Sequence, residues 1–337
     1  MRKYLLPENG NFYKANLHAH STLSDGRLTP RELKDIYKAH GYSVLSLTDH
    51  EFMKSHHDLT DPDFLMMTGF EMGFGEDKPW NEFPKCCHVC FVALNEDEEN
   101  QPCFHRSKYL SDERLREATF DENEPDFERE YTPECINRAM RFGREKGFFV
   151  TYNHPVWSLE RYPEYSQYEG MHAMEICNYS SVVSGWDEYN PRVYEDFLHQ
   201  GKRIFVQGTD DNHNRAEPDD PKWDSFGAFT VLKAPRLDYK SIAHALVAGD
   251  FYASQGPEIK ALWFDEGVLH VECSPAVRIY CITKACRCMA GYGKNGAPAT
   301  EADFVIEPTD GYVRISVQDE KGLRADSNAF FTDELFA

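Results

Sequence analysis

The sequence predicts an α/β fold, a β/α barrel or near-barrel followed by a small antiparallel β module. Over the first two thirds of the chain, short apolar runs end in a polar residue and are followed by a helical stretch or loop, the pattern of β/α units. About seven such runs occur, which suits a barrel, and the last eighty or so residues show only short alternating runs. The length of 337 residues fits one barrel with a small appendage.

The predicted barrel strands are short runs of apolar, β-branched or aromatic residues. They cover 12–18, 42–47, 64–70, 87–94, 147–152, 172–177 and 203–208, with 226–232 as one more strand. Helices are predicted to start at Thr29 and Thr132, because each supplies a capping side chain followed by a proline. A last helix at 238–249 completes a barrel domain that we expect to occupy residues 1–257.

Two further segments depart from the β/α pattern. Residues 95–130 are rich in Asp, Glu, Asn and Arg and have little periodicity. We expect an acidic insertion there, partly helical at most, that folds over the barrel mouth or is mobile. Residues 258–337 contain alternating runs without helical periodicity, so we expect a small antiparallel β module.

Composition excludes several classes of protein. With 41% hydrophobic and 28% charged residues, the chain has the composition of a globular protein. The formal net charge of -21 opposes binding of long nucleic acids, which requires clustered Lys and Arg, and favours a small-molecule substrate. No apolar run has the length of a signal-peptide core or a membrane span, so we expect a soluble, cytoplasmic protein. The ten cysteines do not form the two C-x-x-C pairs that indicate a zinc finger, and they are expected to be reduced thiols.

Side chains suited to metal binding follow the predicted strands. His18 and His20 lie two residues apart on the first strand and must point to the same face. Asp25 follows a short polar turn that could fold its carboxylate back over them. The later strands end in or carry further candidates: Asp49, His50, Glu71, His88, Asn153, His154, Glu175, Asn178, Asp210, Asp211 and His213.

In a β/α barrel the carboxyl ends of the strands meet at one mouth, where such folds hold their active sites. A single histidine in a polar turn is most often a surface or core residue. Core packing, however, gives no reason for an acid or a histidine at successive strand ends, so the whole set predicts a metal site.

In their order and spacing these residues resemble the motifs of the polymerase and histidinol phosphatase (PHP) superfamily of metal-dependent phosphoesterases. The resemblance covers roughly residues 14–257. The motifs are NLHAHSTLSDG at 16–26, LTDHE at 47–51, GFE at 69–71, NHP at 153–155, MEICN at 174–178 and GTDDNH at 208–213. Each motif alone is weak, but together in this order they are highly specific.

The resemblance implies a distorted seven-stranded β/α barrel, a PHP fold, with three metal ions held by nine ligands. One ion would be held by His18, His20, Glu71 and Asp211, and a second would share Glu71 with His88 and His154. The third would take Asp25, His50 and His213. We choose Asp211 over Asp210 because its Asp-x-His spacing places both ligands on one face of an extended chain.

The predicted function is metal-dependent hydrolysis, most simply of a small phosphorylated metabolite or nucleotide. Mixed imidazole and carboxylate ligands favour two or three Zn, Mn or Fe ions, which could activate a bridging hydroxide as the nucleophile. Asp49, Asn153 and Asn178 are candidates for orienting the ligands, and Arg27, Arg161 and Arg215 are candidates for contacting phosphate. Hydrolysis of a carboxylic ester or amide, or a metal-binding interaction module without catalysis, are the alternatives. Substrate identity, monoester or diester preference and oligomeric state stay open.

Overall fold

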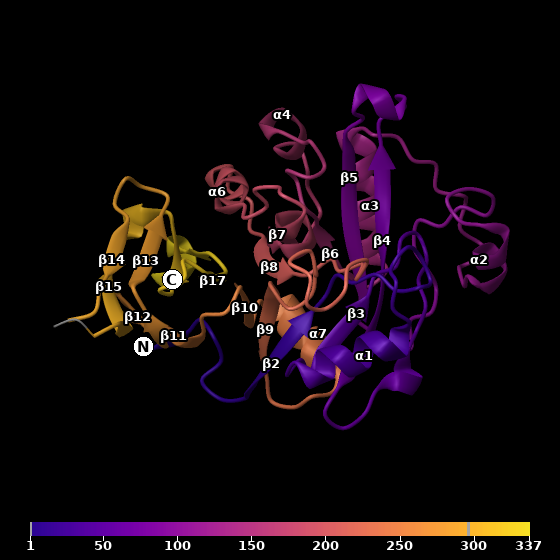
Figure 1. Ribbon diagram of the computed structural model, residues 1–337. Helices are drawn as coiled ribbons and strands as arrows, with labels where there is room; N and C mark the ends of the chain where they lie inside the picture. Colours follow the sequence, from indigo (N-terminus) through magenta and orange to yellow (C-terminus); the bar gives the residue numbers. More distant parts are fainter. Residues whose placement is uncertain (1, 295–296) are drawn as a thin grey trace.

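One large sheet runs through the chain and gives it a mixed α/β fold (Figure 1). The computed structural model describes residues 2–294 and 297–337. The sheet has the order β14-β13-β16-β17-β10-β9-β2-β3-β4-β5-β6-β7-β8. Its body strands are β2 (Asn11–Asn16), β3 (Val44–Leu47), β4 (Leu65–Gly75), β5 (Cys86–Ala93), β6 (Phe148–Tyr152), β7 (Ala173–Asn178), β8 (Phe205–Thr209), β9 (Phe229–Ala234) and β10 (Phe251–Ser254).

The strands on either side of β5 pair in parallel, as β/α units require, but β5 itself does not. Strands β2, β3 and β4 are parallel to one another, as are β6, β7 and β8. Strand β5 instead pairs antiparallel with both β4 and β6. β4 runs on past the predicted end at Phe70 to Gly75, and the connection to β5 holds a short 3-10 turn, η2 (Trp80–Glu82). A long hairpin therefore joins these strands in place of a β/α crossover.

The ends of β2 and β8 lie side by side. Ala19 and Asn212 form a parallel bridge, the His20 amide donates to the Asn212 carbonyl at 3.0 Å, and the Asp211 amide donates to the His18 carbonyl at 2.9 Å. Among the described residues no longer ladder joins these two strands, and closure into a barrel stays a prediction.

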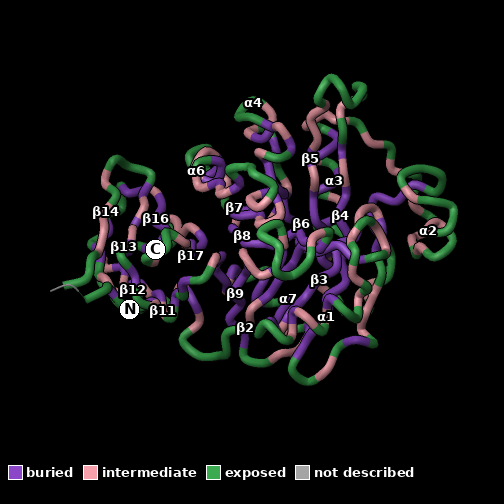
Figure 2. The backbone as a smooth tube through the Cα atoms, viewed as in Figure 1, coloured by how far each residue is buried: buried purple, intermediate pink, exposed green. Residues whose placement is uncertain are grey.

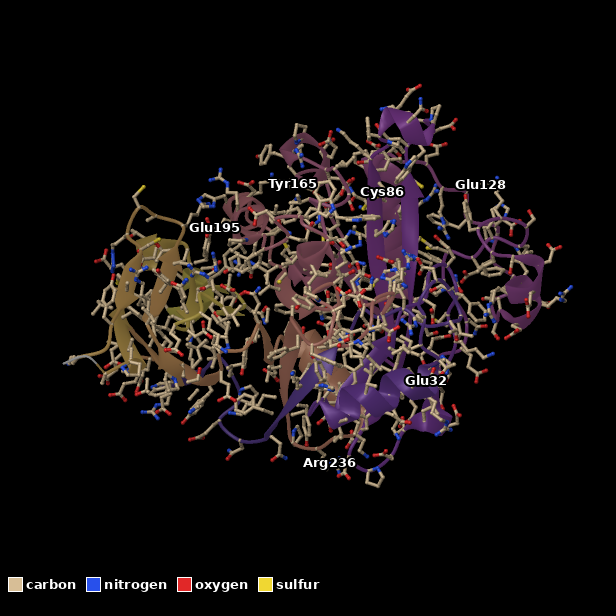
Figure 3. All side chains as sticks on the ribbon, viewed as in Figure 1. Glu32, Cys86, Glu128, Tyr165, Glu195 and Arg236 are labelled. Carbon is tan, nitrogen blue, oxygen red and sulfur yellow. The ribbon has the colours of Figure 1, made fainter. Side chains whose placement is uncertain are left out.

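The predicted helix starts are confirmed. Thr29 caps α1 (Pro30–Ala39) in a capping box with Glu32, which Figure 3 labels. Thr132 caps α3 (Pro133–Glu145), and Asp238 caps α7 (Tyr239–Ala248). The remaining helices and turns are η1 (His57–Leu59), α2 (Asp112–Glu117), α4 (Tyr162–Tyr165), α5 (Tyr179–Val183), α6 (Pro191–His199), η3 (Pro308–Asp310) and α8 (Thr332–Leu335). None of the helices in the described residues is long and apolar enough to cross a membrane.

The acidic insertion folds against the turns that follow β2 and β3. Its one helix is α2, from which the Arg114 guanidinium donates to the Leu23 carbonyl at 3.1 Å. The Gln101 side chain bonds the backbone of Glu51 and Met53, at 2.9 Å in each case. Buried Arg129 forms an ion pair with Glu51 at 2.6 Å. The insertion thereby fixes the chain on either side of the predicted metal ligands.

The C-terminal strands are antiparallel, and only some of them continue the large sheet of the body. They are β11 (Ile259–Asp265), β12 (Val268–Ala276), β13 (Arg278–Thr283), β14 (Met289–Gly291), β15 (Ala299–Val305), β16 (Tyr312–Gln318), β17 (Arg324–Ser327) and β18 (Phe330–Phe331). β17 pairs with β10 of the body, so that β13, β14, β16 and β17 continue the large sheet. Strands β11, β12 and β15 form a separate four-stranded sheet with β1 (Lys3–Tyr4). A division into domains at residue 257 stays a prediction.

A buried ion-pair network also joins the two parts. Arg314 of β16 is buried and contacts Asp326 of β17 at 3.2 Å and Glu195 of α6 at 2.6 Å (Figure 3 labels Glu195). The Tyr189 hydroxyl donates to the same Asp326 carboxylate at 2.9 Å. Because a buried charge is costly unless it is paired, this network favours one relative arrangement of tail and body.

The buried side chains form three hydrophobic clusters along the sheet. One cluster contains Leu45 of β3 together with Ile315 of β16, so the tail and the body share core packing. Figure 2 shows buried residues along the central strands and exposed residues around α2 and the outer loops. The buried central strands therefore give the residues at their ends a rigid support.

Candidate metal centre

His18 and His20 follow β2 and point to the same side, as their spacing predicts. Both side chains are buried, and their Nε2 atoms lie 3.2 Å apart. Asp211 Oδ1 lies 3.1 Å from His18 Nε2 and 2.9 Å from His20 Nε2. Ligand atoms of a tetrahedral site with bonds of about 2.0–2.1 Å are separated by about 3.3 Å. The observed separations are close to that value.

Glu71 of β4 lies at the centre of the cluster and is fully buried. Its Oε1 atom lies 3.2 Å from His18 Nε2, 3.2 Å from His88 Nδ1 and 3.3 Å from His154 Nε2. Its Oε2 atom lies 2.9 Å from His50 Nδ1. One carboxylate thus faces imidazoles from four different segments of the chain.

His88 reaches this centre because β5 runs antiparallel to its neighbours. It lies near the start of β5 and pairs in register with Gly73 of β4. The amino end of an antiparallel strand lies at the same edge as the carboxyl ends of its neighbours. The convergence of carboxyl ends that the sequence predicts for most strands therefore does not account for His88, which meets the cluster from the amino end of its strand.

A third group of side chains surrounds Asp25. Its Oδ1 atom lies 3.3 Å from His213 Nε2, 3.7 Å from His50 Nε2 and 4.0 Å from His20 Nδ1. Among the described residues, four groups have potential ligand atoms within 4.8 Å of one another: His20, Asp25, His50 and His213; His18, Glu71 and His154; His18, His20 and Asp211; and His50, Glu71 and His88. The structure thus brings together the nine side chains that the resemblance implies as ligands.

These side chains fit divalent cations. His20 Nδ1 is buried and has no hydrogen-bond partner among the described residues, and Glu71 Oε2 meets His50 Nδ1 at 2.9 Å without hydrogen-bond geometry. Leaving buried polar atoms without partners is costly, and a cation between them would remove that cost. Imidazoles mixed with carboxylates suit Zn, Mn or Fe. All ten cysteines are free, and none belongs to the four groups found in the described part of the chain.

Burial and the nearby carboxylates pull the imidazole pKa values apart. Burial and the neighbouring His50 and His213 lower the pKa of His20 to about 4. Burial also disfavours the charged form of His18, but Asp211 and other anionic neighbours outweigh it and raise the pKa of His18 well above its usual value. Metal binding requires neutral imidazoles, so protons would be released when ions bind.

Two of these nine residues have a left-handed backbone. His154 has φ 24° and Asp211 has φ 51°, and neither is a glycine. Such conformations cost about 1–3 kcal/mol and persist where the surrounding structure enforces them, often at functional sites. The strain aims both side chains at the cluster.

The three candidate orienting residues each contact the cluster or its supports. Asp49 accepts hydrogen bonds from the amide and hydroxyl groups of Ser21 and Ser24, and so shapes the turn before Asp25. The Asn153 amide donates to Glu71 Oε1 at 2.8 Å. The Asn178 amide donates to Asp211 Oδ2 at 3.1 Å.

Asp210 and Asp211 have different surroundings. Asp210 is buried away from the imidazoles and accepts hydrogen bonds from the backbone amides of residues 226–228 and from the Tyr37 hydroxyl. Asp211 faces His18 and His20. The structure therefore places Asp211, the residue chosen from the sequence, in the position suited to a ligand.

Glu175 is a functional candidate for which the sequence indicated no role beyond its place near a strand end. This buried carboxylate of β7 lies 2.7 Å from His18 Nδ1 and also accepts from the His154 amide and the Thr209 hydroxyl. A carboxylate on Nδ1 holds the proton there and leaves Nε2 free to bind metal. The signal in the sequence was its position in the MEICN motif, at the strand that ends in Asn178.

We expect Glu175→Gln to lower metal affinity about 10–100-fold. A glutamine amide can donate to Nδ1, which would move the imidazole proton of His18 to the metal-binding nitrogen. Competition with a chelator measures the affinity, and Glu169→Gln, at an exposed position, is the matched control. Equal affinities in both variants would contradict this role.

The three candidate phosphate-binding arginines lie in different places. Arg215 lines the cavity over the cluster and pairs with Asp25 at 2.5 Å. Arg27 pairs with Glu217 at 2.7 Å. Arg161 donates to the carbonyl of Glu160 and does not line the cavity. Lys222, which no motif indicated, lines the cavity, and its ammonium has no partner among the described residues.

The cavity over the cluster has a volume of 740 Å³. Its floor is made by the cluster residues Asp25, His50, Glu71, His88, His154, Asp211 and His213, and its walls include Trp157, Ser180, Ser184, Arg215 and Lys222. A volume of this size is typical of a pocket for a small molecule.

The side chains of the ordered motifs converge on Glu71 and form a cluster of candidate metal ligands at the strand ends. The chain matches no protein-family model and no curated protein.

Three of the solved structures that are similar to the chain are as follows. One is a two-domain protein from Bacteroides vulgatus ATCC 8482 that contains a predicted PHP-like metal-dependent phosphoesterase, at 17% identity and TM-score 0.45, covering 96% of this chain and 97% of that one. Another is a provisionally described metal-dependent phosphoesterase from Bifidobacterium adolescentis ATCC 15703, at 15% identity and TM-score 0.37, covering 63% of this chain and 91% of that one. The third is an amidohydrolase from Chromobacterium violaceum with bound sulfate and no metal, at 13% identity and TM-score 0.35, covering 59% of this chain and 87% of that one. These similarities are too low to transfer an activity or a substrate.

Proposed function

We propose that the protein is a metal-dependent hydrolase of the PHP type that cleaves phosphoesters of small molecules. The observation that carries the proposal is the convergence of nine imidazole and carboxylate side chains around the buried Glu71. In this proposal β2–β8 form the distorted barrel of that superfamily, and the cluster holds two or three divalent ions.

Bound divalent ions would supply Lewis acidity, which lowers the pKa of a water molecule and neutralises charge on phosphoryl oxygens. The chain's own residues set the geometry. Glu71 lies between the groups and is held by Asn153, while Glu175 fixes the ring of His18. Groups held rigidly in a buried site need little reorganisation during the reaction, which is the main advantage of a preorganised site.

The surroundings of the cluster favour a compact anionic substrate. The cavity walls offer Arg215 and Lys222 for phosphate oxygens and the hydroxyls of Ser180 and Ser184 for further hydrogen bonds. The chain as a whole carries a net charge of -21, which opposes the approach of a long polyanion. We therefore propose a small phosphorylated metabolite or nucleotide, and not long nucleic acid, as the substrate.

A substrate panel tests this function. Protein reconstituted separately with Zn, Mn, Fe and Mg is assayed with a nucleoside monophosphate, a sugar phosphate, p-nitrophenyl phosphate, an activated carboxylic ester and a single-stranded oligonucleotide. We expect the highest kcat/KM for a phosphate monoester. Efficient cleavage of the carboxylic ester without phosphatase activity would instead assign the chain to ester or amide hydrolysis. Preference for the oligonucleotide would refute the argument from charge.

Lys222→Ala is expected to raise KM for a phosphate monoester about tenfold and to change kcat little. The ammonium is unpaired among the described residues and lines the cavity, and a charge-assisted hydrogen bond to an anion contributes about 1.5–3 kcal/mol. Steady-state kinetics measures the change, and Lys260→Ala, at an exposed position in β11, is the control. A KM equal to that of the control would show that the substrate phosphate lies elsewhere.

A further inference from the structure

Trp157 is an exposed tryptophan on the wall of a polar cavity. Its side chain lines the cavity over the metal cluster and is 39% exposed. Its ring centroid lies 4.9 Å from that of His154 and 5.5 Å from that of His88. The indole therefore stands beside the two imidazoles that share Glu71, at the point where a substrate would meet them.

The backbone that carries Trp157 is held by buried groups. The Glu188 carboxylate is fully buried and accepts the amide of Trp157 at 2.7 Å and that of Val156 at 3.1 Å. The Ser158 hydroxyl lies 3.2 Å from His154 Nδ1, and the Ser158 carbonyl accepts from the Cys86 amide at 3.1 Å.

The far end of the same loop is anchored equally well. Glu160 is buried, and its carboxylate accepts hydrogen bonds from three tyrosine hydroxyls, those of Tyr131 at 2.8 Å, Tyr152 at 2.5 Å and Tyr168. Because the loop is anchored at both ends, the backbone of Trp157 is held in place and the indole stands at the cavity wall.

We propose that Trp157 forms a stacking subsite for a flat aromatic or heteroaromatic group on the alcohol part of the substrate, close to the ester oxygen. Two observations support a flat ligand group. The indole is the one large aromatic side chain among the cavity-lining residues of the described chain, and the rest of the lining is mostly charged or hydroxylated. Aromatic rings gain most from stacking or edge contacts with another ring. This inference rests on the proposed function, because the ester oxygen is defined by phosphoester cleavage.

The test uses two ligand pairs that differ only in whether the ring is flat. Binding is measured by calorimetry with phenethylphosphonate and cyclohexylethylphosphonate, which cannot be hydrolysed. Turnover is measured with benzyl phosphate and cyclohexylmethyl phosphate, whose leaving alcohols are similar. The variants are Trp157→Leu, which removes the ring, and Trp157→Phe, which keeps one. Trp186→Leu is the matched control, since Trp186 is 38% exposed and does not line the cavity.

We expect the metal-loaded protein to bind the flat phosphonate about three- to tenfold more tightly than the saturated one, the range of one aromatic contact. Trp157→Leu should abolish that preference, Trp157→Phe should keep most of it, and the control should not change it. Metal content, measured in parallel, should be the same in all four proteins. A preference that survives in Trp157→Leu, or is absent from the unaltered protein, overturns the subsite.

Loss of metal from Trp157→Leu would also overturn it, by showing that the indole only supports the imidazoles. If neither benzyl phosphate nor cyclohexylmethyl phosphate is cleaved while the binding preference depends on Trp157, the stacking site stands, but its assignment to the alcohol part of a phosphoester fails together with the proposed function. If both esters are cleaved without any dependence on Trp157, the subsite fails and the proposed function stands.

Discussion

Glu71→Ala is expected to lower kcat/KM about a thousandfold or more. Glu71 is the only carboxylate of the described cluster that faces imidazoles from His18, His50, His88 and His154 together. Its removal takes away the carboxylate that would be shared by neighbouring metal ions. Charge stabilisation by metal ions contributes several kcal/mol to hydrolysis. His20→Ala should produce a loss of the same order. Steady-state kinetics with the best metal measures both.

His57→Ala is the control for these variants. His57 lies outside the cluster, with its Nε2 atom 3.2 Å from the Thr68 hydroxyl. Its removal should change the rate little. Comparable losses in all three variants, with circular dichroism unchanged, would contradict the assignment of His20 and Glu71 to the metal centre.

Metal removal is expected to abolish activity and to destabilise the fold. Because nine candidate ligand side chains lie in overlapping groups, we expect at least two ions per chain when metal is supplied. Ions that bind only the folded state stabilise it by about 4 kcal/mol at a thousandfold excess over Kd. Elemental analysis gives the number of ions, and thermal unfolding with and without a chelator gives the change in Tm.

Restoring metal should recover both the activity and the Tm, which separates metal loss from irreversible unfolding. One equivalent of metal or fewer, after loading and careful purification, would refute a centre of two or three ions. A Tm unaffected by chelation would show that the cluster is held together by its protein contacts alone.

Residues whose placement follows from local rules were predictable from the sequence. The two-residue spacing of His18 and His20 fixes their common face, since strand side chains alternate. Helices α1, α3 and α7 start where a capping side chain precedes them, because capping satisfies amides that the helix itself leaves free. These rules involve only neighbouring residues, and they hold in the structure.

Residues whose role depends on distant contacts were not predictable. Glu175 meets His18 across 157 residues of sequence, and Lys222 and Trp157 are recognised only by the cavity that they line. Arg161 shows the converse, since it closely follows the NHP motif but binds the carbonyl of Glu160. The β4–β5 hairpin escaped prediction because apolar runs on parallel and antiparallel strands look alike in sequence.

The continuity of the sheet from β10 into β17 restricts how such a protein can change over evolution. Ala253 of β10 pairs with Asp326 of β17, and the Asp326 carboxylate also accepts a hydrogen bond from the Tyr189 hydroxyl. The neighbouring Glu188 holds the loop that follows His154. A tail joined to the body in this way cannot be exchanged between proteins as an independent domain. Replacing it by an unrelated tail would expose the edge of β10, and grafting it onto another body would leave Arg314 without its partner Glu195. Tail and catalytic body are therefore expected to be inherited together.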